Sequence, residues 1–176
     1  MFVDFSHFLK INFRRKIVEP PLFKLYEIGI LELSTIYYNS SYENQKREEA
    51  VEDAFKFSEL VMEKYNPDKV LDLGCGVGRF MLPFYESGVK VKGVEGSSYA
   101  VNNPIEENLD IIQYDLTKPL KLNGNFDLVI CIEVLEHIPE KHSEKVVELI
   151  SKSGNKAIIS AAEPGQGGTY HVNEKN

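Results

Sequence analysis

Residues 70–80 read VLDLGCGVGRF, a short apolar run with one acid, followed by three glycines spaced two apart. The apolar run predicts a buried β-strand, and the glycines predict a tight turn whose backbone approaches a ligand closely. In an open α/β sheet, such a turn lies past the carboxyl end of a strand, where ligands bind. The stretch therefore predicts both a fold class and the place of a binding site.

Strands and helices alternate around this turn. Apolar runs and turn residues predict strands over 69–73, 89–95, 110–114, 127–132 and 156–161 and helices over 80–86, after Ser97 or Ser98, and over 142–151. Such alternation is typical of parallel βαβ units with right-handed crossovers. We therefore expect an α/β fold, a Rossmann-like three-layer sandwich. Its sheet is mostly parallel, with at least five strands and helices on both faces.

A longer amphipathic helix is predicted ahead of the first strand, over 42–65. Ser40 and Ser41 are good N-cap residues for it, and Asn66-Pro67 ends it. Residues 1–41 then form a separate helical cap segment, with phenylalanines at roughly helical spacing before a short basic cluster at 14–16. The cap packs on the core over 42–176 or, alternatively, offers an amphipathic surface to an anionic partner.

Composition restricts the partners. The 176 residues carry a net charge of −7, which argues against a nucleic-acid binder that works by broad phosphate neutralisation. The two cysteines, Cys75 and Cys131, lie in apolar or glycine-rich runs and predict a reducing, cytoplasmic setting without disulfides. No apolar stretch approaches the ~20 residues of a membrane span, and the N-terminus lacks the order of a signal peptide.

The spacing of the glycines selects between two nucleotide-like cofactors. A dinucleotide turn has the pattern G-x-G-x-x-G, whose third glycine would fall at Arg79 if the first two are Gly74 and Gly76. The third glycine here is Gly78, one residue early. The pattern therefore disfavours NAD.

The turn instead resembles the first motif of the class I S-adenosylmethionine-dependent methyltransferases, an acid at the strand end followed by G-x-G-x-G. Asp72, Gly74, Gly76 and Gly78 occupy those positions, and the backbone of Cys75 lies between them. The resemblance implies that the amino-acid end and sugar of the cofactor lie against bare backbone. The acid can meet the ammonium group of the cofactor.

Three later strand ends extend the resemblance, which covers roughly residues 42–162. An acid follows the second strand, another follows the third, and FDLVICIEVLEHIP is similar to the next motif of the family. The resemblance implies further cofactor contacts at Glu95, Gly96, Asp115, Leu116 and Glu133. A carboxylate after the second strand can accept both ribose hydroxyls, a device that NAD enzymes share.

The motif EVLEH offers candidates for catalysis. In one interpretation His137 is a general base that takes a proton from an acceptor hydroxyl, with Glu133 facing the reacting end of the cofactor. In another, less favoured interpretation, Glu133, Glu136 and His137 help to hold a divalent metal. The E-x-x-E-H order is similar to that of ubiquinone-pathway O-methyltransferases and of small-RNA 2′-O-methyltransferases, where a further histidine completes a metal site. Alternatively, Glu136 and His137 only favour a helix start on the exposed surface.

The glycine-rich tail supplies a second candidate base. The run from Pro164 to Gly168 predicts a turning loop, and His171 follows it. The run resembles the loop after the fifth strand in small methyltransferases that act on small-molecule or sugar-like acceptors. The resemblance implies that this loop lies over the acceptor pocket; alternatively, the tail is a mobile end with solvated polar residues.

The resemblance thus implies S-adenosylmethionine-dependent methyl transfer to a small-molecule or sugar-like acceptor, at oxygen. The C-terminal strand pair of the family is absent, so we expect residues 1–41 or a second copy of the chain in a homodimer to cover the fifth strand. Two alternatives stay open. One is an RNA 2′-O-methyltransferase, and the other is a cofactor-binding module without catalysis, because the last strands are missing.

Overall fold

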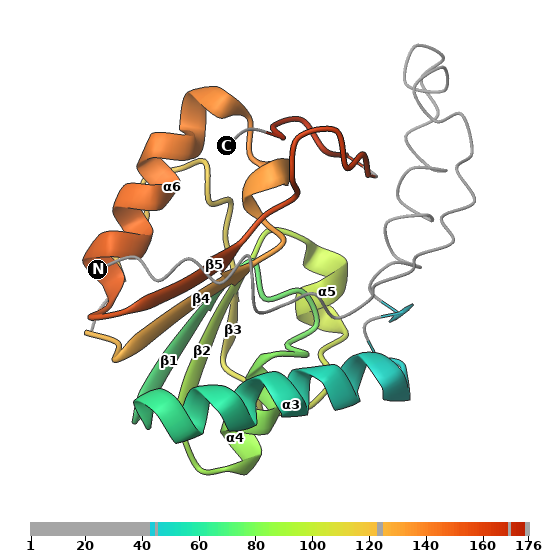
Figure 1. The fold of residues 1–176 in the computed structure, drawn as a ribbon, viewed down its shortest axis with the longest axis vertical. Helices are drawn as coiled ribbons and strands as arrows, with labels where there is room; N and C mark the ends of the chain where they lie inside the picture. Colours follow the sequence, from blue (N-terminus) through green and yellow to red (C-terminus); the bar gives the residue numbers. More distant parts are fainter. Residues whose placement is uncertain (1–42, 45, 123–124, 169, 175–176) are drawn as a thin grey trace.

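The structure, a computed structural model, describes residues 43–44, 46–122, 125–168 and 170–174, so the predicted cap segment lies outside the described residues. Its strands are β1 (Lys69–Leu73), β2 (Lys90–Glu95), β3 (Ile111–Gln113), β4 (Leu128–Ile132) and β5 (Ala157–Ser160). Its helices are α3 (Glu48–Tyr65), α4 (Met81–Glu86), α5 (Ser98–Asn102), the 3₁₀ turn η1 (Leu135–His137) and α6 (Glu140–Ser153). The predicted alternation is confirmed (Figure 1).

The five strands form one all-parallel sheet in the order β3-β2-β1-β4-β5. The chain builds outward from β1 to β3 and then returns to the other side of β1 with β4. Ligands in such sheets bind at the carboxyl ends of the strands where the order reverses. That point lies between β1 and β4, next to the glycine turn.

The alternation of side chains along each strand makes the sheet the middle of three layers. Leu71 and Val129 face α6, where they pack with Val146 and Ile150. Their neighbours on the strands, Val70, Leu128 and Ile130, face the opposite layer and pack with Val61 of α3 and Phe84 of α4. Figure 1 shows α3 and α4 on one side of the sheet and α6 on the other. The predicted three-layer sandwich is confirmed.

The observed helices differ from the predicted ones at their starts. Helix α3 begins at Glu48, and its N-cap residue Arg47 makes no side-chain hydrogen bond, whereas the proposed caps Ser40 and Ser41 lie outside the described residues. Helix α6 begins two residues earlier than predicted, directly after Pro139, whose fixed φ suits a helix start. The end of α3 is as predicted: Asn66 adopts the left-handed conformation, with φ of 42°.

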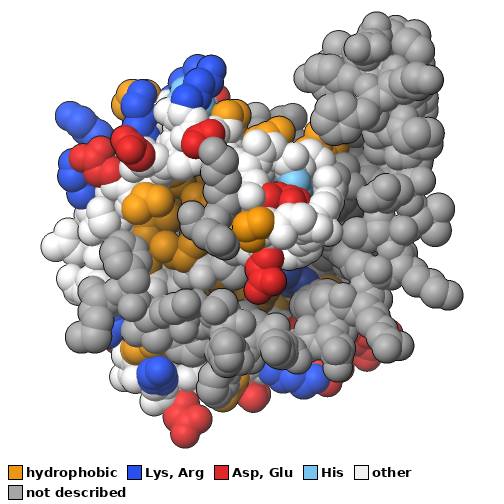
Figure 2. All heavy atoms as spheres, turned by 45° about the horizontal axis from the view of Figure 1, so that its top comes forward, with side chains coloured by type: hydrophobic (Ala, Val, Ile, Leu, Met, Phe, Trp, Pro, Cys, Tyr) orange, Lys and Arg blue, Asp and Glu red, His pale blue; other side chains and the backbone are white. Residues whose placement is uncertain are grey.

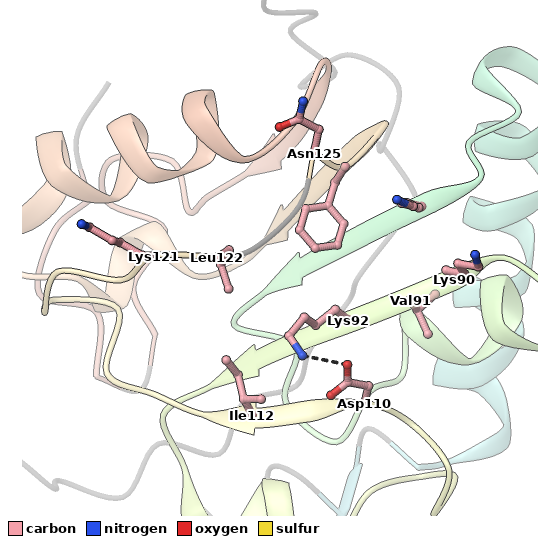
Figure 3. A pocket seen from close by; sticks show the side chains of 10 residues that line it. Lys90, Val91, Lys92, Asp110, Ile112, Lys121, Leu122 and Asn125 are labelled. Atoms are coloured by element: carbon pink, nitrogen blue, oxygen red, sulfur yellow. Dashed lines mark hydrogen bonds and ion pairs between the residues drawn. The ribbon is translucent and has the colours of Figure 1, made fainter.

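Two further features complete the description. None of the helices within the described ranges is both long and apolar enough to cross a bilayer. A cavity of about 490 Å³ lies near the first residues of β1 and β2, lined by Lys69, Lys90, Lys92 and Lys121 among others (Figure 3). Lys92 donates to Asp110 at 2.7 Å there. This cavity lies away from the carboxyl ends of the strands, so it is not the expected cofactor site.

Candidate active site

The glycine turn packs tightly against the ends of two neighbouring strands. Gly74 donates its backbone N–H to the Val94 carbonyl of β2 at 2.8 Å, and its φ is +78°. A Cβ at Gly74 would lie 2.9 Å from Cγ1 of Val134 and closer still to Cγ2, just beyond the end of β4. Glycine at this position is therefore required twice, by backbone conformation and by space.

Glu95 braces the same turn from the end of β2. Its Oε2 accepts the N–H of Gly76 at 2.8 Å, and its Oε1 accepts the N–H of Ser97 at 2.7 Å. The Ser97 side chain in turn caps α5 by accepting the N–H of Ala100. The sequence predicted that Glu95 accepts hydrogen bonds from the ribose hydroxyls of the cofactor. It did not predict that Glu95 also holds the backbone of the glycine turn in place.

Asp72 is a buried carboxyl at the end of β1. The residue is 2% exposed, and its Oδ2 has no hydrogen-bond partner in the described part of the chain. Burial, and next the nearby charge of Glu95, raise the pKa of Asp72 from 3.8 to about 8, while Arg79 opposes the rise. A buried carboxyl with one oxygen unpartnered among the described residues, beside a glycine turn, is suited to receive a cationic group.

The pKa of Asp72 gives the first testable prediction. Because the folded pKa of about 8 lies above the unfolded value near 3.8, the unfolded state loses its proton first as pH rises. This group therefore lowers the free energy of unfolding between those two pH values, by up to about 1.4 kcal/mol per pH unit. Asp72→Asn should remove that slope, measured by urea unfolding at about pH 5 and about pH 7.5. Equal slopes in the parent protein and the variant would contradict the prediction.

The end of β3 carries the other predicted cofactor residues. Asp115 is exposed, and its Oδ1 accepts the N–H of Thr117 at 2.9 Å and the Thr117 hydroxyl at 2.6 Å. These bonds hold the pKa of Asp115 below its usual range. Leu116 is buried next to it, whereas Gly96, beyond β2, is exposed. Asp115 therefore forms a local turn that fixes the loop position after β3.

Glu133 lies at the carboxyl end of β4 in a rarely populated conformation, with φ of +55°. Its Oε1 accepts the Ser160 hydroxyl at 2.8 Å, and its backbone N–H donates to the Ser160 carbonyl at 3.1 Å. These contacts join the ends of β4 and β5. Non-glycine residues held at positive φ concentrate at functional sites, so the role predicted for Glu133 stays a hypothesis that this conformation motivates.

A cluster of one carboxyl and two imidazoles follows β4. Glu136, His137 and His171 each offer a ligand atom, and these atoms lie within 4.8 Å of one another. The two imidazole rings meet edge to face, with centroids 5.1 Å apart. The sequence grouped Glu133 with Glu136 and His137; the structure instead adds His171, because the tail folds back over η1. We call Glu136, His137 and His171 the histidine cluster.

Glu136 is fully buried, which overturns the alternative of an exposed helix start. Neither carboxyl oxygen has a hydrogen-bond partner in the described ranges. Burial, and then the Glu133 charge, raise the pKa of Glu136 to about 7 against the effects of its own backbone N–H and of His171. Burial also lowers the pKa of His137, so its imidazole is neutral near pH 7. A neutral imidazole can accept a proton or bind a metal.

The described residues of the C-terminal segment, 161–168 and 170–174, are fastened over this cluster. The N–H groups of Val172 and Asn173 donate to the Glu136 carbonyl at 2.8 and 3.1 Å. The Asn173 amide donates to Ser143 Oγ of α6 at 2.9 Å, and Nδ1 of His137 lies 3.2 Å from the Tyr170 carbonyl. Figure 2 shows histidine and acidic side chains side by side on the face that carries this segment. The tail is thus held on the site in the described part of the chain.

The fold and this site define a class of protein. A parallel sheet in the order 3-2-1-4-5, a glycine turn after β1, an acid after β2 and an acidic–histidine motif after β4 are together the core of a class I S-adenosylmethionine-dependent methyltransferase. Asp72 and the turn fit that cofactor. The unpartnered Oδ2 of Asp72 suits its ammonium group, and the glycines leave bare backbone for its sugar.

Comparison with known proteins agrees. The family model described as "Methyltransferase domain" matches residues 42–158, and the chain belongs to that family. Magnesium-protoporphyrin O-methyltransferase of Synechocystis is 33% identical over 100 residues, 53% of this chain and 44% of that protein. Ubiquinone biosynthesis O-methyltransferase of Rickettsia canadensis is 31% identical over 102 residues, 52% of this chain and 42% of that protein. The chain therefore spans less than half the length of either relative.

A solved structure shows the same fold. The crystal structure of magnesium protoporphyrin IX methyltransferase from Synechocystis with bound SAH matches at a TM-score of 0.53 and 26% identity. The match covers 66% of this chain and 56% of that chain. S-adenosylmethionine, the cofactor that the glycine turn and Asp72 fit, is the cofactor of the class to which this fold belongs.

Proposed function

We propose that the protein transfers a methyl group from S-adenosylmethionine to a hydroxyl of a small-molecule or sugar-like acceptor. The observation that carries the proposal is the histidine cluster, which brings two imidazoles together just beyond β4. An acceptor hydroxyl must lose its proton on methylation, and a neutral imidazole is the group best suited to take it near pH 7. Two of the curated relatives, those compared above, are named as O-methyltransferases, which supports oxygen as the acceptor atom.

In this proposal, the residues that hold the cofactor surround the carboxyl ends of β1 to β4. They are Asp72, Gly74, Cys75, Gly76, Gly78, Glu95, Gly96, Asp115, Leu116 and Glu133. S-adenosylmethionine, when bound, supplies an electrophilic methyl group on a sulfonium. The chain aligns the acceptor with that methyl group, and the buried surroundings exclude water. His137 and His171 are the candidate bases.

The experiment that tests the proposal is transfer of labelled methyl from S-adenosylmethionine to fractionated small-molecule extracts, with total RNA as a second acceptor. We expect label in the small-molecule fraction, in a bond stable to mild base as an ether is. Label in RNA would favour the alternative enzyme, against which the net charge of −7 argues. Tight cofactor binding with no transfer to any fraction would favour a binding module without catalysis.

A second form of the chemistry is favoured by one specific observation. One buried carboxyl and two imidazoles, with ligand atoms within 4.8 Å of one another, are a donor set that suits a divalent transition metal. A metal held by Glu136, His137 and His171 would polarise the acceptor hydroxyl and replace the base. The metal-assisted and the base-assisted reaction differ in their response to a chelator. A chelator that abolishes transfer, with recovery on adding Mn²⁺ or Zn²⁺, supports the metal, whereas unchanged transfer supports the base.

The remaining predictions concern the N-terminal residues, the assembly of the chain and its location in the cell. We propose that residues 1–41 form a unit separate from the core over 42–176. We also propose that this unit or a second copy of the chain covers the outer edge of β5, which pairs with no other strand among the described residues. The cytoplasmic setting stays a prediction from the cysteines, both of which are buried without a disulfide. Light scattering of the full chain, compared with a chain that begins at residue 42, tests the homodimer and the covering role together.

A further inference from the structure

A carboxylate in the tail, Glu174, contacts the candidate base His171. Oε1 of Glu174 lies 2.7 Å from Nδ1 of His171, and Oε2 accepts the N–H of Gly165 at 3.0 Å. Both side chains are largely covered, at 12% exposure for His171 and 18% for Glu174. One carboxylate thus joins the imidazole to the glycine-rich turn that precedes it.

The chemistry of this pair determines where the imidazole carries its proton. Glu174 lies 2.7 Å from Nδ1 of His171 and also accepts the N–H of Gly165, which is the arrangement of an ionised carboxylate between two donors. An ionised carboxylate only accepts hydrogen bonds. Nδ1 of His171 must therefore donate, and in the neutral ring the lone pair is left on Nε2.

Gly168 lies beside the edge of the His171 ring that carries Nε2. A Cβ at Gly168 would lie 2.8 Å from Cδ2 of His171 and closer still to Nε2 and Cε1. No side chain fits at this position without moving the ring. Because Gly168 has no side chain, this residue leaves the space beside Nε2 and Cε1 of His171 unfilled.

We propose that Glu174 is a positioning residue that orients His171 and holds its proton on Nδ1, so that Nε2 is the atom that receives the proton of the acceptor. The inference rests on the proposed O-methyl transfer. The acceptor hydroxyl gives its proton to Nε2 as its oxygen bonds to the methyl carbon. The bond between that carbon and the sulfur of S-adenosylmethionine breaks in the same step, and S-adenosylhomocysteine leaves with the electron pair. The resulting imidazolium, stabilised by the Glu174 carboxylate, then releases the proton to water. A carboxylate behind a catalytic histidine acts in this way in hydrolase triads.

The first test reads the tautomer directly and requires no acceptor. Long-range ¹H–¹⁵N spectra of protein labelled with ¹⁵N-histidine distinguish a proton on Nδ1 from one on Nε2, and loss of one signal in His171→Ala assigns the residue. We expect His171 to carry its proton on Nδ1 in the parent protein and to shift toward Nε2 in Glu174→Leu. Glu163→Leu, at an exposed glutamate of the same segment, is the matched control and should leave the tautomer unchanged. A parent protein with the proton on Nε2, or a Glu174→Leu variant with an unchanged tautomer, overturns the proposal.

The second test is kinetic. Glu174→Leu should lower kcat about 10- to 100-fold with the dissociation constant of S-adenosylmethionine unchanged, and Glu174→Asp should recover part of the loss. Loss of cofactor binding in step with kcat would instead mean a purely structural role and overturns the proposal. If the parent protein transfers no methyl group, the proposed function fails by itself, and the tautomer measurement still decides the role of Glu174.

Discussion

Replacing His171 or His137 by alanine should lower the rate of methyl transfer by about 100-fold or more, with the affinity for S-adenosylmethionine preserved. A positioned general base contributes roughly 10²- to 10⁴-fold to a reaction in which a proton is transferred. Neither imidazole belongs to the glycine turn or to its brace Glu95, so the cofactor site stays intact. Single-turnover rates together with calorimetry of cofactor binding separate the two effects.

The double variant shows whether the two histidines act together. Their rings lie 5.1 Å apart, so their effects should not add, and the double variant should be little slower than the worse single variant. His142→Ala, at a histidine of α6 outside the histidine cluster, controls for the loss of any imidazole. A single variant with the parent rate removes that histidine from the candidate bases.

Gly74→Ala should destabilise the protein by about 3 kcal/mol and prevent tight cofactor binding. The positive φ of 78° disfavours any side chain by roughly 1–2 kcal/mol. The added Cβ also meets the buried side chain of Val134, which requires repacking at a further cost of about 1–3 kcal/mol. Urea unfolding gives the change in free energy.

The chain offers a matched control for this substitution. Gly88 has nearly the same φ, +81°, but a Cβ there would meet nothing within 4 Å. Gly88→Ala should therefore show only the backbone effect, about 1–2 kcal/mol. Combining Gly74→Ala with Val134→Ala then isolates the steric effect. The smaller side chain at position 134 should relieve part of the destabilisation caused by the alanine at position 74. If Gly74→Ala lowers the free energy of unfolding no more than Gly88→Ala does, the close approach of Gly74 to Val134 is contradicted.

The sequence was sufficient for the features that depend on local pattern. The buried runs around Asp72 and Cys131 predicted β1 and β4, and Asn66-Pro67 predicted the end of α3. Parallel strands carry their carboxyl ends to one edge, so the sequence also brought Asp72 and Glu95 to the same site. These predictions succeeded because they require only periodicity and turn chemistry.

Features that depend on tertiary contact were missed. Glu136 is fully buried because the tail returns over η1, and no periodicity in a three-residue turn reveals that. The bond between Glu174 and His171 was missed for the same reason, although the three-residue spacing of a histidine and an acid after a glycine run could have suggested a pair. The brace made by Glu95 is likewise visible only when the backbone of the turn is in place.

The position of β1 at the centre of the sheet gives its two strand pairings very different separations along the chain. Its pairing with β2 spans one short helix, but Asp127, which precedes β4 and accepts the N–H groups of Asp68 and Lys69, is 58 residues from Lys69. Closing a loop of that length before any contact is made slows folding. The glycine turn follows β1 and the histidine cluster follows β4, so this long-range pairing joins the two parts of the candidate site. We therefore expect the candidate site to form together with the long-range pairing at the middle of the sheet and not with any one local helix.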